Sequence, residues 1–235
     1  MKVCVIHGSS RKNGNTECAI GLVKKTLSRL GEVMFEDVLL PQDLPHFCLG
    51  CFACMHTGEY AGQNCPHKQY THPILQKMLD SDGIVIASPS YSLAESGQVK
   101  AFLDHFACTY VNHRPNEAMF SKIVFVVSTA AGAGTHHVVS NIARSVRFWG
   151  VNRVVSYTAN LWALNWGDMP KAKRGRREAK LAAKTRRFYM LMKRRMHLHR
   201  RMRAWFWFRM CRQLIGSYAP TEPDRIYWTK KGWLK

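Results

Sequence analysis

Short apolar runs of strand length alternate, over the first two thirds of this 235-residue chain, with segments whose apolar residues recur every three or four positions. Parallel strands need long return connections across a sheet, and such connections are commonly right-handed helical crossovers. The pattern therefore predicts an α/β fold with a doubly wound, five-stranded parallel sheet covered by helices on both faces. The expected strands are residues 2–7, 33–40, 83–88, 123–128 and 154–158, and the helices between them are residues 15–30, 74–79, 97–107 and 138–148.

Three loops follow strands at the edge where such sheets bind ligands, outside the carboxyl ends of the strands. They are residues 8–16, 88–96 and 129–135. The second loop leaves a buried strand at Ser88 and turns through Pro89 towards the next helix. The third loop, from Thr129 to Gly134, consists of residues too small to obstruct a flat ring. We expect the second and third loops to form the edge of a ligand crevice.

The first loop has the composition of an anion-binding turn. Its small residues would let backbone amides approach an anion, and the helix that follows presents its positive N-terminal end. Arg11 adds charge, and the side-chain donors are Ser9, Ser10, Asn15 and Thr16. The loop lacks the glycine pattern of a dinucleotide fold and the Gly-Lys-Ser/Thr ending of an NTPase loop. We interpret it as a phosphate-binding loop, with an ordinary strand-to-helix turn and a polar helix cap as the alternative.

Four of the eight cysteines lie close together, at positions 48, 51, 54 and 65. The Cys-x-x-Cys-x-x-Cys run with a final Cys65-Pro66 is similar to the ferredoxin pattern, in which thiolates hold an iron–sulfur cluster. Ten residues separate Cys54 from Cys65, where ferredoxins have three. Three hypotheses stay open: an iron–sulfur cluster on Cys48, Cys51, Cys54 and Cys65, a zinc site that recruits His46, His56 or His67, or free redox-active thiols.

Positive charge is concentrated in the C-terminal part of the chain. The formal net charge is +20, and residues 168–235 hold 21 Lys and Arg against four acidic residues. Apolar residues recur at helical spacing within 171–212, which predicts one long amphipathic helix with a basic face. We expect its apolar stripe to pack on the domain or on a second subunit. A membrane surface or nucleic acid is the alternative partner. The aromatic segment 223–234 is expected to dock back onto the protein.

The start of the chain shows no basic leader followed by an apolar stretch and a cleavage site. No apolar run reaches the roughly eighteen residues of a membrane span. We therefore expect a soluble, cytoplasmic protein. Cysteines in that compartment stay reduced, so their clustering favours metal or redox chemistry over disulfides.

Together the three motifs resemble the NADPH-dependent FMN reductase family, and especially its iron–sulfur flavoprotein branch. The motifs are Gly-Ser-Ser-Arg-x-x-Gly-Asn-Thr in the first loop, Ser-Pro-Ser-Tyr-Ser in the second, and Cys-x-Gly-Cys-Phe-x-Cys in the insertion. Downstream of the second motif the resemblance continues through Gly97, Lys100, Phe102, Leu103 and Asp104. It covers roughly residues 1–160 and implies a flavodoxin-like fold with bound flavin mononucleotide (FMN).

The resemblance also implies roles for individual residues. The first-loop residues Ser9, Ser10, Arg11, Asn15 and Thr16 would hold the FMN phosphate. The second-loop residues Pro89, Ser90, Tyr91 and Ser92 would line the ribityl chain and the ring, and Thr129, Ala130 and Gly132 would lie at the other edge of the isoalloxazine.

The resulting hypothesis is an oxidoreductase that passes electrons from NAD(P)H through FMN to a second acceptor and works as a homodimer. The flavin supplies the chemistry, so no acid/base residues are singled out. An electron-transfer module for a protein partner, or a protein that binds anionic surfaces through its basic helix, is the alternative. We expect an FMN-binding domain in residues 1–167, with a cysteine-rich insertion at 41–72, and a basic helical extension in residues 168–235.

Overall fold

One parallel sheet organises the chain, in a computed structural model that describes residues 1–56, 61–197 and 202–234. Its strand order is β2-β1-β3-β5-β6, which confirms the predicted doubly wound sheet of five parallel strands. The strands are β1 (Lys2–His7), β2 (Met34–Leu39), β3 (Gly83–Tyr91), β5 (Ile123–Ala130) and β6 (Arg153–Asn160), and the short β4 (Ala94–Glu95) pairs antiparallel with the end of β3. The strand order reverses between β1 and β3, so ligands are expected at the carboxyl ends of these two strands.

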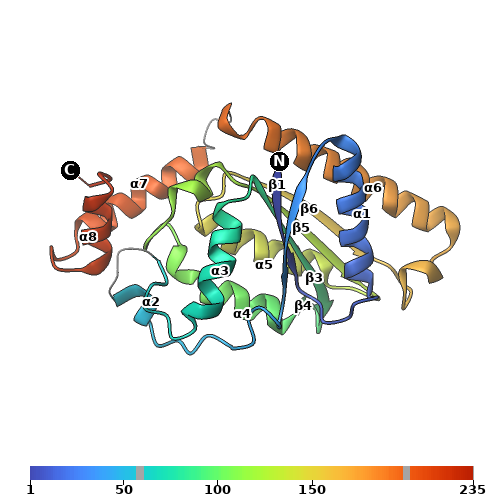
Figure 1. Cartoon of the computed structure of the whole chain (residues 1–235), viewed down its shortest axis with the longest axis horizontal. Coiled ribbons are helices and arrows are strands. Elements are labelled where there is room, and N and C mark those ends of the chain that lie inside the picture. The colour runs from blue at the N-terminus through green and yellow to red at the C-terminus, as the bar shows by residue number, and fades with distance from the viewer. Residues whose placement is uncertain (57–60, 198–201, 235) are drawn as a thin grey trace.

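Helices cover both faces of the sheet (Figure 1). One face carries α1 (Asn15–Leu30) and α6 (Lys171–Lys193), and the other carries α3 (Lys68–Leu79), α4 (Gly97–His105) and α5 (Thr135–Phe148). The central strands β1, β3 and β5 are buried along most of their length because both of their faces are covered. A one-turn helix, α2 (Ala53–His56), lies in the cysteine-rich insertion.

The basic helix α6 is part of the main core. Its Leu181, Phe188 and Met192 are buried in the same apolar cluster as β1, β5 and α1. Gly83 at the start of β3 allows this close approach, since a Cβ there would lie 2.3 Å from the Met192 sulfur. The apolar stripe of this helix therefore packs on the domain, as expected from its spacing.

We predicted a single long basic helix over 171–212. A long basic helix is present, but the predicted length is wrong. Helix α6 ends at Lys193 and is followed by a short 3-10 turn, Arg195–His197. A separate helix, α7 (Met202–Gly216), then begins on the other side of residues 198–201, which lie outside the described residues (Figure 1). Helical spacing continues across the break because both helices bury an apolar stripe, although each packs against a different cluster.

The C-terminal segment docks back, as predicted. It forms α8 (Pro223–Lys230), where Trp228 is fully buried and its Nε1 donates a hydrogen bond to the His113 carbonyl oxygen at 2.8 Å. The Tyr227 hydroxyl donates to the Pro115 carbonyl oxygen at 2.8 Å. Among the described residues, no helix is both long enough and apolar enough to cross a membrane.

Candidate functional site

The first two predicted loops are joined at the carboxyl edge of the sheet. The Ser96 hydroxyl donates a hydrogen bond to the Gly8 carbonyl oxygen at 2.6 Å, and the Gly8 amide donates to the Ala87 carbonyl oxygen at 2.8 Å. A Cβ at position 8 would lie 2.3 Å from Val99 Cγ2 and 2.5 Å from that carbonyl oxygen. Only glycine fits here, so the loop after β1 is held directly against β3 and the start of α4.

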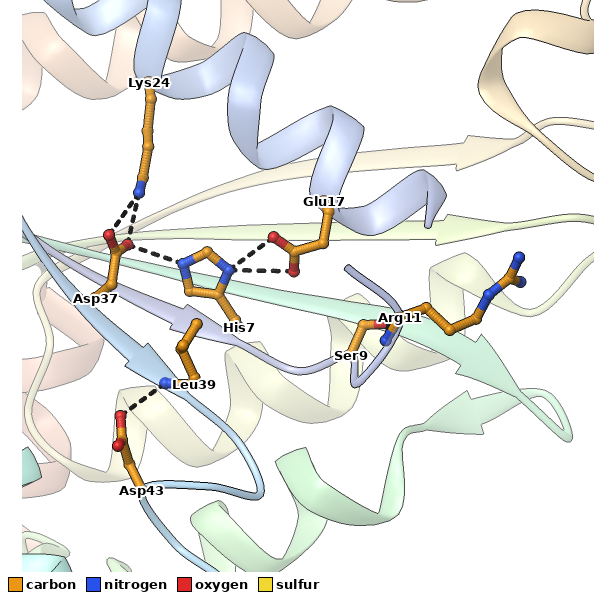
Figure 2. A network of polar contacts seen from close by, with 8 residues as sticks. All are labelled: His7, Ser9, Arg11, Glu17, Lys24, Asp37, Leu39 and Asp43. Atoms are coloured by element: carbon orange, nitrogen blue, oxygen red, sulfur yellow. Dashed lines mark hydrogen bonds and ion pairs between the residues drawn. The ribbon is translucent and has the colours of Figure 1, made fainter. Parts of the chain in front are cut away.

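The loop between β1 and α1 has exposed hydrogen-bond donors. Helix α1 begins after Gly14, whose residue type provides no side-chain cap for the first amides of the helix. Within the loop the Ser9 hydroxyl accepts a hydrogen bond from the Arg11 amide at 3.2 Å, while the Ser10 and Arg11 side chains are exposed. Figure 2 shows the Arg11 side chain extending outward from the loop. These groups are placed to meet an anion that arrives from solvent.

Two residues whose hydroxyls we predicted to contact the ligand are buried inside the protein. Thr16 and Thr129 are buried, and their Oγ1 atoms are 2.9 Å apart, so the two hydroxyls bond to each other. This contact joins the first turn of α1 to β5. Asn15 also has a structural contact, because its Nδ2 donates to the Leu164 carbonyl oxygen at 2.9 Å.

The second loop is a β-hairpin that projects from the end of β3. Ser90 pairs with Glu95 and Tyr91 with Ala94, which leaves Ser92 and Leu93 as the two turn residues. Both turn residues have positive φ, 49° and 65°, as a two-residue hairpin turn requires. Such backbone costs about 1 kcal/mol or more per non-glycine residue and is often found at ligand sites.

The third loop faces this hairpin. Pro89 pairs in register with Thr129, and β5 ends one residue later at Ala130. Gly134 caps α5 in the left-handed region, with φ of 97°, and a Cβ there would lie 2.3 Å from the Ser90 hydroxyl oxygen. That hydroxyl is buried and has no hydrogen-bond partner in the part of the chain that the structure describes.

A fourth loop, which the sequence reasoning missed, completes the edge. It follows β6 and is fixed to the third loop, since the Leu161 amide donates to the Ala130 carbonyl oxygen at 2.9 Å. Trp162 and Leu164 on this loop are 69% and 76% exposed, and Trp162 has positive φ. Large apolar side chains directly after a predicted strand were the signal in the sequence that could have identified this loop.

These features fit FMN. The uncapped start of α1 and the exposed Arg11 suit a phosphate, and the unpartnered Ser90 hydroxyl offers a buried polar atom to a ligand. Exposed apolar side chains around the edge would pack on a flat ring: Tyr91, Leu93, Trp162 and Leu164. The structure brings the predicted residues of all three loops to one edge, although Thr16 and Thr129 use their hydroxyls on each other.

A charged network lies beside the first loop (Figure 2). The buried His7 ring lies between two carboxylates, with Nδ1 2.9 Å from Glu17 Oε2 and Nε2 2.8 Å from Asp37 Oδ1. Lys24 Nζ is 2.6 Å from the same Asp37 oxygen. Burial alone would lower the pKa of His7, but its hydrogen bonds with Asp37 and Glu17 raise it to about 9. The network therefore joins β1, α1 and β2 through a protonated imidazole at neutral pH.

The four clustered cysteines do not form a ligand cage. Cys48 and Cys51 are exposed, while Cys54 and Cys65 are half-buried. Among the described residues, no three His, Cys, Asp or Glu side chains come together as a metal site requires. Residues 57–60 of the predicted insertion lie outside the described part of the chain. As placed, the thiols do not fit an iron–sulfur cluster or a zinc ion.

The histidines named for the zinc hypothesis pack mainly with other rings. His46 stacks on His67 with ring centroids 4.8 Å apart, and His67 Nδ1 lies 3.1 Å from His105 Nε2. Burial lowers the pKa of His67, and the neighbouring His105 and His46 lower it further. His56 is exposed at the end of α2. These rings form a small aromatic cluster beside the cysteines.

One cysteine of the cluster is paired with a thiol that the sequence did not single out. A hydrogen bond with the buried Cys108 stabilises the Cys54 thiolate, and with the nearby Arg114 and His113 it lowers the pKa of Cys54 to about 7. The same contact and burial raise the pKa of Cys108. The pKa of Cys54 therefore lies below the usual range of a thiol.

Replacing Cys108 with alanine should slow the alkylation of Cys54. The variant removes the hydrogen bond that stabilises the thiolate, so we expect the rate with iodoacetamide at pH 7 to fall about tenfold. Mass spectrometry of the Cys54 peptide, in metal-free protein over a pH series, measures this. The exposed Cys18 on α1 is the internal control. The same pH midpoint for Cys54 in both proteins would contradict the pairing.

Known proteins match this arrangement in sequence and in fold. The NADPH-dependent FMN reductase family matches residues 1–163. An iron–sulfur flavoprotein of Clostridioides difficile (strain 630) is 35% identical over 105 residues, 44% of this chain and 45% of that protein. Another, from Methanocaldococcus jannaschii, is 26% identical over 205 residues, 82% of this chain and 98% of that protein. The chain spans about half the length of the first curated relatives that it matches.

Solved structures show the same architecture. One described as a flavone reductase superposes with a TM-score of 0.61 at 18% sequence identity and covers 86% of this chain and 66% of that chain. At this identity the likeness extends to the fold alone. The four loops at the carboxyl edge therefore lie on a fold shared with known reductases.

Proposed function

The chain belongs to the NADPH-dependent FMN reductase family of oxidoreductases, and we propose that it passes electrons from NAD(P)H through bound FMN to a second acceptor. The observation that supports this most directly is the set of loops at the switch in strand order. They combine an uncapped helix start, an exposed arginine and an unpartnered buried hydroxyl. FMN, when bound, supplies the redox chemistry by accepting a hydride and releasing electrons.

In this proposal the chain's own residues bind and orient the cofactor. Ser9, Ser10, Arg11 and the first amides of α1 hold the phosphate, and Asn15 fixes the fourth loop beside it. Thr16 acts through its contact with Thr129, as a positioning residue. Pro89, Ser90, Tyr91 and Ser92 line the ribityl chain and one edge of the ring, and Ala130 and Gly132 line the other.

We also propose that the carboxyl edge of the sheet excludes water from the flavin ring. Trp162 and Leu164 are among the most exposed large apolar side chains of the described residues. Packing on a flat ring would bury them and limit the access of water to the reacting face. We propose that the protein works as a homodimer. We place the protein in the cytoplasm, where its thiols would stay reduced.

Arg11→Ala should weaken FMN binding about tenfold, because it removes one charge-assisted contact with the phosphate. Titration of flavin-free protein with FMN, followed by quenching of flavin fluorescence, measures the dissociation constant. The matched control is Arg29→Ala, which removes an exposed arginine from the last turn of α1, the helix that follows the Arg11 loop. Undiminished affinity in Arg11→Ala would refute the phosphate assignment.

An anaerobic absorption spectrum before and after addition of NADPH or NADH tests the function itself. Flavin bands that bleach on addition of the nicotinamide support the reductase. Failure of the protein to bind FMN would refute the proposal. A further broad absorption beyond the flavin bands would show an iron–sulfur cluster, which the names of the relatives suggest for those proteins.

The electron-transfer module remains the second candidate because of these relatives. A cluster would need Cys48, Cys51, Cys54 and Cys65 to meet around one centre. Burial raises the pKa of Cys65, and the other three lie near enough to raise it further, but no three of them are placed to hold a metal ion among the described residues. We therefore derive no step through a cluster. Retained flavin with no oxidation of NADPH or NADH would favour this candidate over the reductase.

A further inference from the structure

Helix α7 has two apolar faces, although docking onto the protein uses only one. Phe208, Cys211 and Ile215 recur at three- and four-residue steps and face inward, where Cys211 and Ile215 are buried. A second stripe at four-residue steps points the other way: Phe206, Met210 and Leu214 are 55%, 42% and 50% exposed. An amphipathic surface helix normally presents polar residues on that side.

The inner face anchors the helix, together with Trp207, whose ring centroid lies 5.6 Å from that of Phe148. Phe208 stacks on Trp228, with ring centroids 4.9 Å apart, and meets the edge of Trp233 at 5.5 Å. Phe120 also contacts Phe208, at 5.9 Å. The outer stripe is therefore not needed to hold α7 in place. An exposed apolar stripe of this kind marks an interaction surface.

Interfacial aromatic residues and cations flank the outer stripe. Trp205 is more than half exposed and Trp207 about a third, and the Arg209 guanidinium lies over the Trp205 ring at 5.5 Å. Arg212 is exposed one turn further along. Tryptophan rings favour the boundary between headgroups and acyl chains, and arginine favours anionic headgroups.

The charge around α7 selects the kind of partner. Residues 193–216, from the end of α6 through α7, contain eight Lys and Arg and no Asp or Glu. The neighbouring α8 carries Asp224, which is paired with His113 and Arg114. A second copy of the chain would bring an equally basic segment against this one, which like-charge repulsion disfavours. An anionic surface is complementary, because its charge attracts the basic residues near it.

We propose that α7 docks on an anionic lipid bilayer and lies in the plane of its surface. Phe206, Met210 and Leu214 enter the apolar boundary, while Arg209 and Arg212 contact the headgroups. The helix lies on the membrane and does not span it, as its length and charge require. Figure 1 shows α7 and α8 at one end of the molecule, away from the β4 hairpin, so docking leaves the proposed flavin edge accessible.

Sedimentation with vesicles tests the docking, using the whole 235-residue chain as purified. We expect binding to vesicles of phosphatidylglycerol and phosphatidylcholine, a blue shift of tryptophan emission, and loss of binding in phosphatidylcholine alone or at high salt. The double variant Met210→Ser with Leu214→Ser should bind about tenfold more weakly, because two inserted apolar side chains are lost. Both side chains are exposed, so the fold should persist, which thermal unfolding verifies.

A matched control exists on the edge strand β2. Met34 and Leu39 are 63% and 45% exposed, so Met34→Ser with Leu39→Ser makes the same chemical change away from α7. To test the role of charge, the double variant Arg209→Gln, Arg212→Gln is compared with the double variant Lys25→Gln, Arg29→Gln on α1. All four side chains are exposed. We expect only the α7 variants to weaken binding.

Three results would overturn the proposal. Equal loss of vesicle binding in the α7 and control variants would show that binding is not specific to α7. Binding to duplex DNA with no binding to vesicles would assign the basic surface to nucleic acid. A dimer in solution that the α7 variants dissociate, together with no vesicle binding, would make the outer stripe a subunit contact.

Discussion

Gly134→Val is expected to lower the free energy of unfolding by roughly 3 kcal/mol and to weaken FMN binding. A valine is strained at the φ of 97° found here, at a cost of about 1–2 kcal/mol. Its Cβ would also lie 2.3 Å from the Ser90 hydroxyl oxygen and 2.8 Å from the Leu93 Cα, and such overpacking typically costs about 1–3 kcal/mol. Backbone at Leu93 cannot yield as a side chain can, so the hairpin that bears the proposed ring contacts must move.

Gly132→Val is the matched control in the same loop. A Cβ at position 132 meets nothing within 4 Å, and Gly132 is not among the residues with positive φ. Urea unfolding of flavin-free protein should therefore show a lower free energy of unfolding for Gly134→Val only. The FMN affinity of Gly132→Val then reports separately on the proposed ring edge. Equal stability of the two variants would contradict the packing described at Gly134.

The parallel sheet was predictable because its strands are buried on both faces. The residues 2–7 form an apolar run between polar boundaries, and β1 has the same bounds. The strand predicted at 83–88 extends to Tyr91, because Ser90 and Tyr91 pair locally with β4. Polar residues such as Ser-Pro-Ser-Tyr indicate a loop, and only the tertiary fold shows that part of this loop is a hairpin.

The break between α6 and α7 could not be read from periodicity. Both segments bury residues at helical steps, Leu181 and Phe188 in one and Cys211 and Ile215 in the other. The sequence contains no proline or glycine between residues 176 and 215 to mark an end. The helices separate because their buried stripes belong to different clusters, which is a property of the folded molecule.

The sequence predicted which loops lie at the same edge of the sheet, but not which of their atoms contact one another. Composition identified three loops that the fold brings to one edge, since carboxyl ends of parallel strands share that edge. It could not show that Thr16 bonds to Thr129 or that Cys54 pairs with Cys108, because these partners are distant in sequence. The assignment of individual residues to FMN stays a prediction.

The His7 network should make stability fall as the pH rises above neutrality. Hydrogen bonds raise the pKa of His7 from its ordinary 6.5 to about 9, so the folded protein binds the proton more tightly than the unfolded chain. This stabilisation is complete below pH 6.5 and is lost as the pH rises through about 9. On the acid side, the hydrogen bond with His7 lowers the pKa of Asp37 from 3.8 to about 2, against the effect of burial. That contribution is present above pH 3.8 and is lost as the pH falls through about 2.

His7→Asn removes the titrating ring but keeps a polar side chain near the two carboxylates. We expect it to lower the free energy of unfolding by about 2 kcal/mol at pH 6, since the buried network loses a charged donor. The deficit should shrink towards pH 9.5, because the wild-type protein loses the same stabilisation as His7 deprotonates. Urea unfolding at pH 6, 7.5 and 9.5 measures both proteins, with His136→Asn, an exposed histidine on α5, as the control. A deficit that stays constant over this range would mean that His7 packs as a neutral ring, and that the first loop is supported by shape alone.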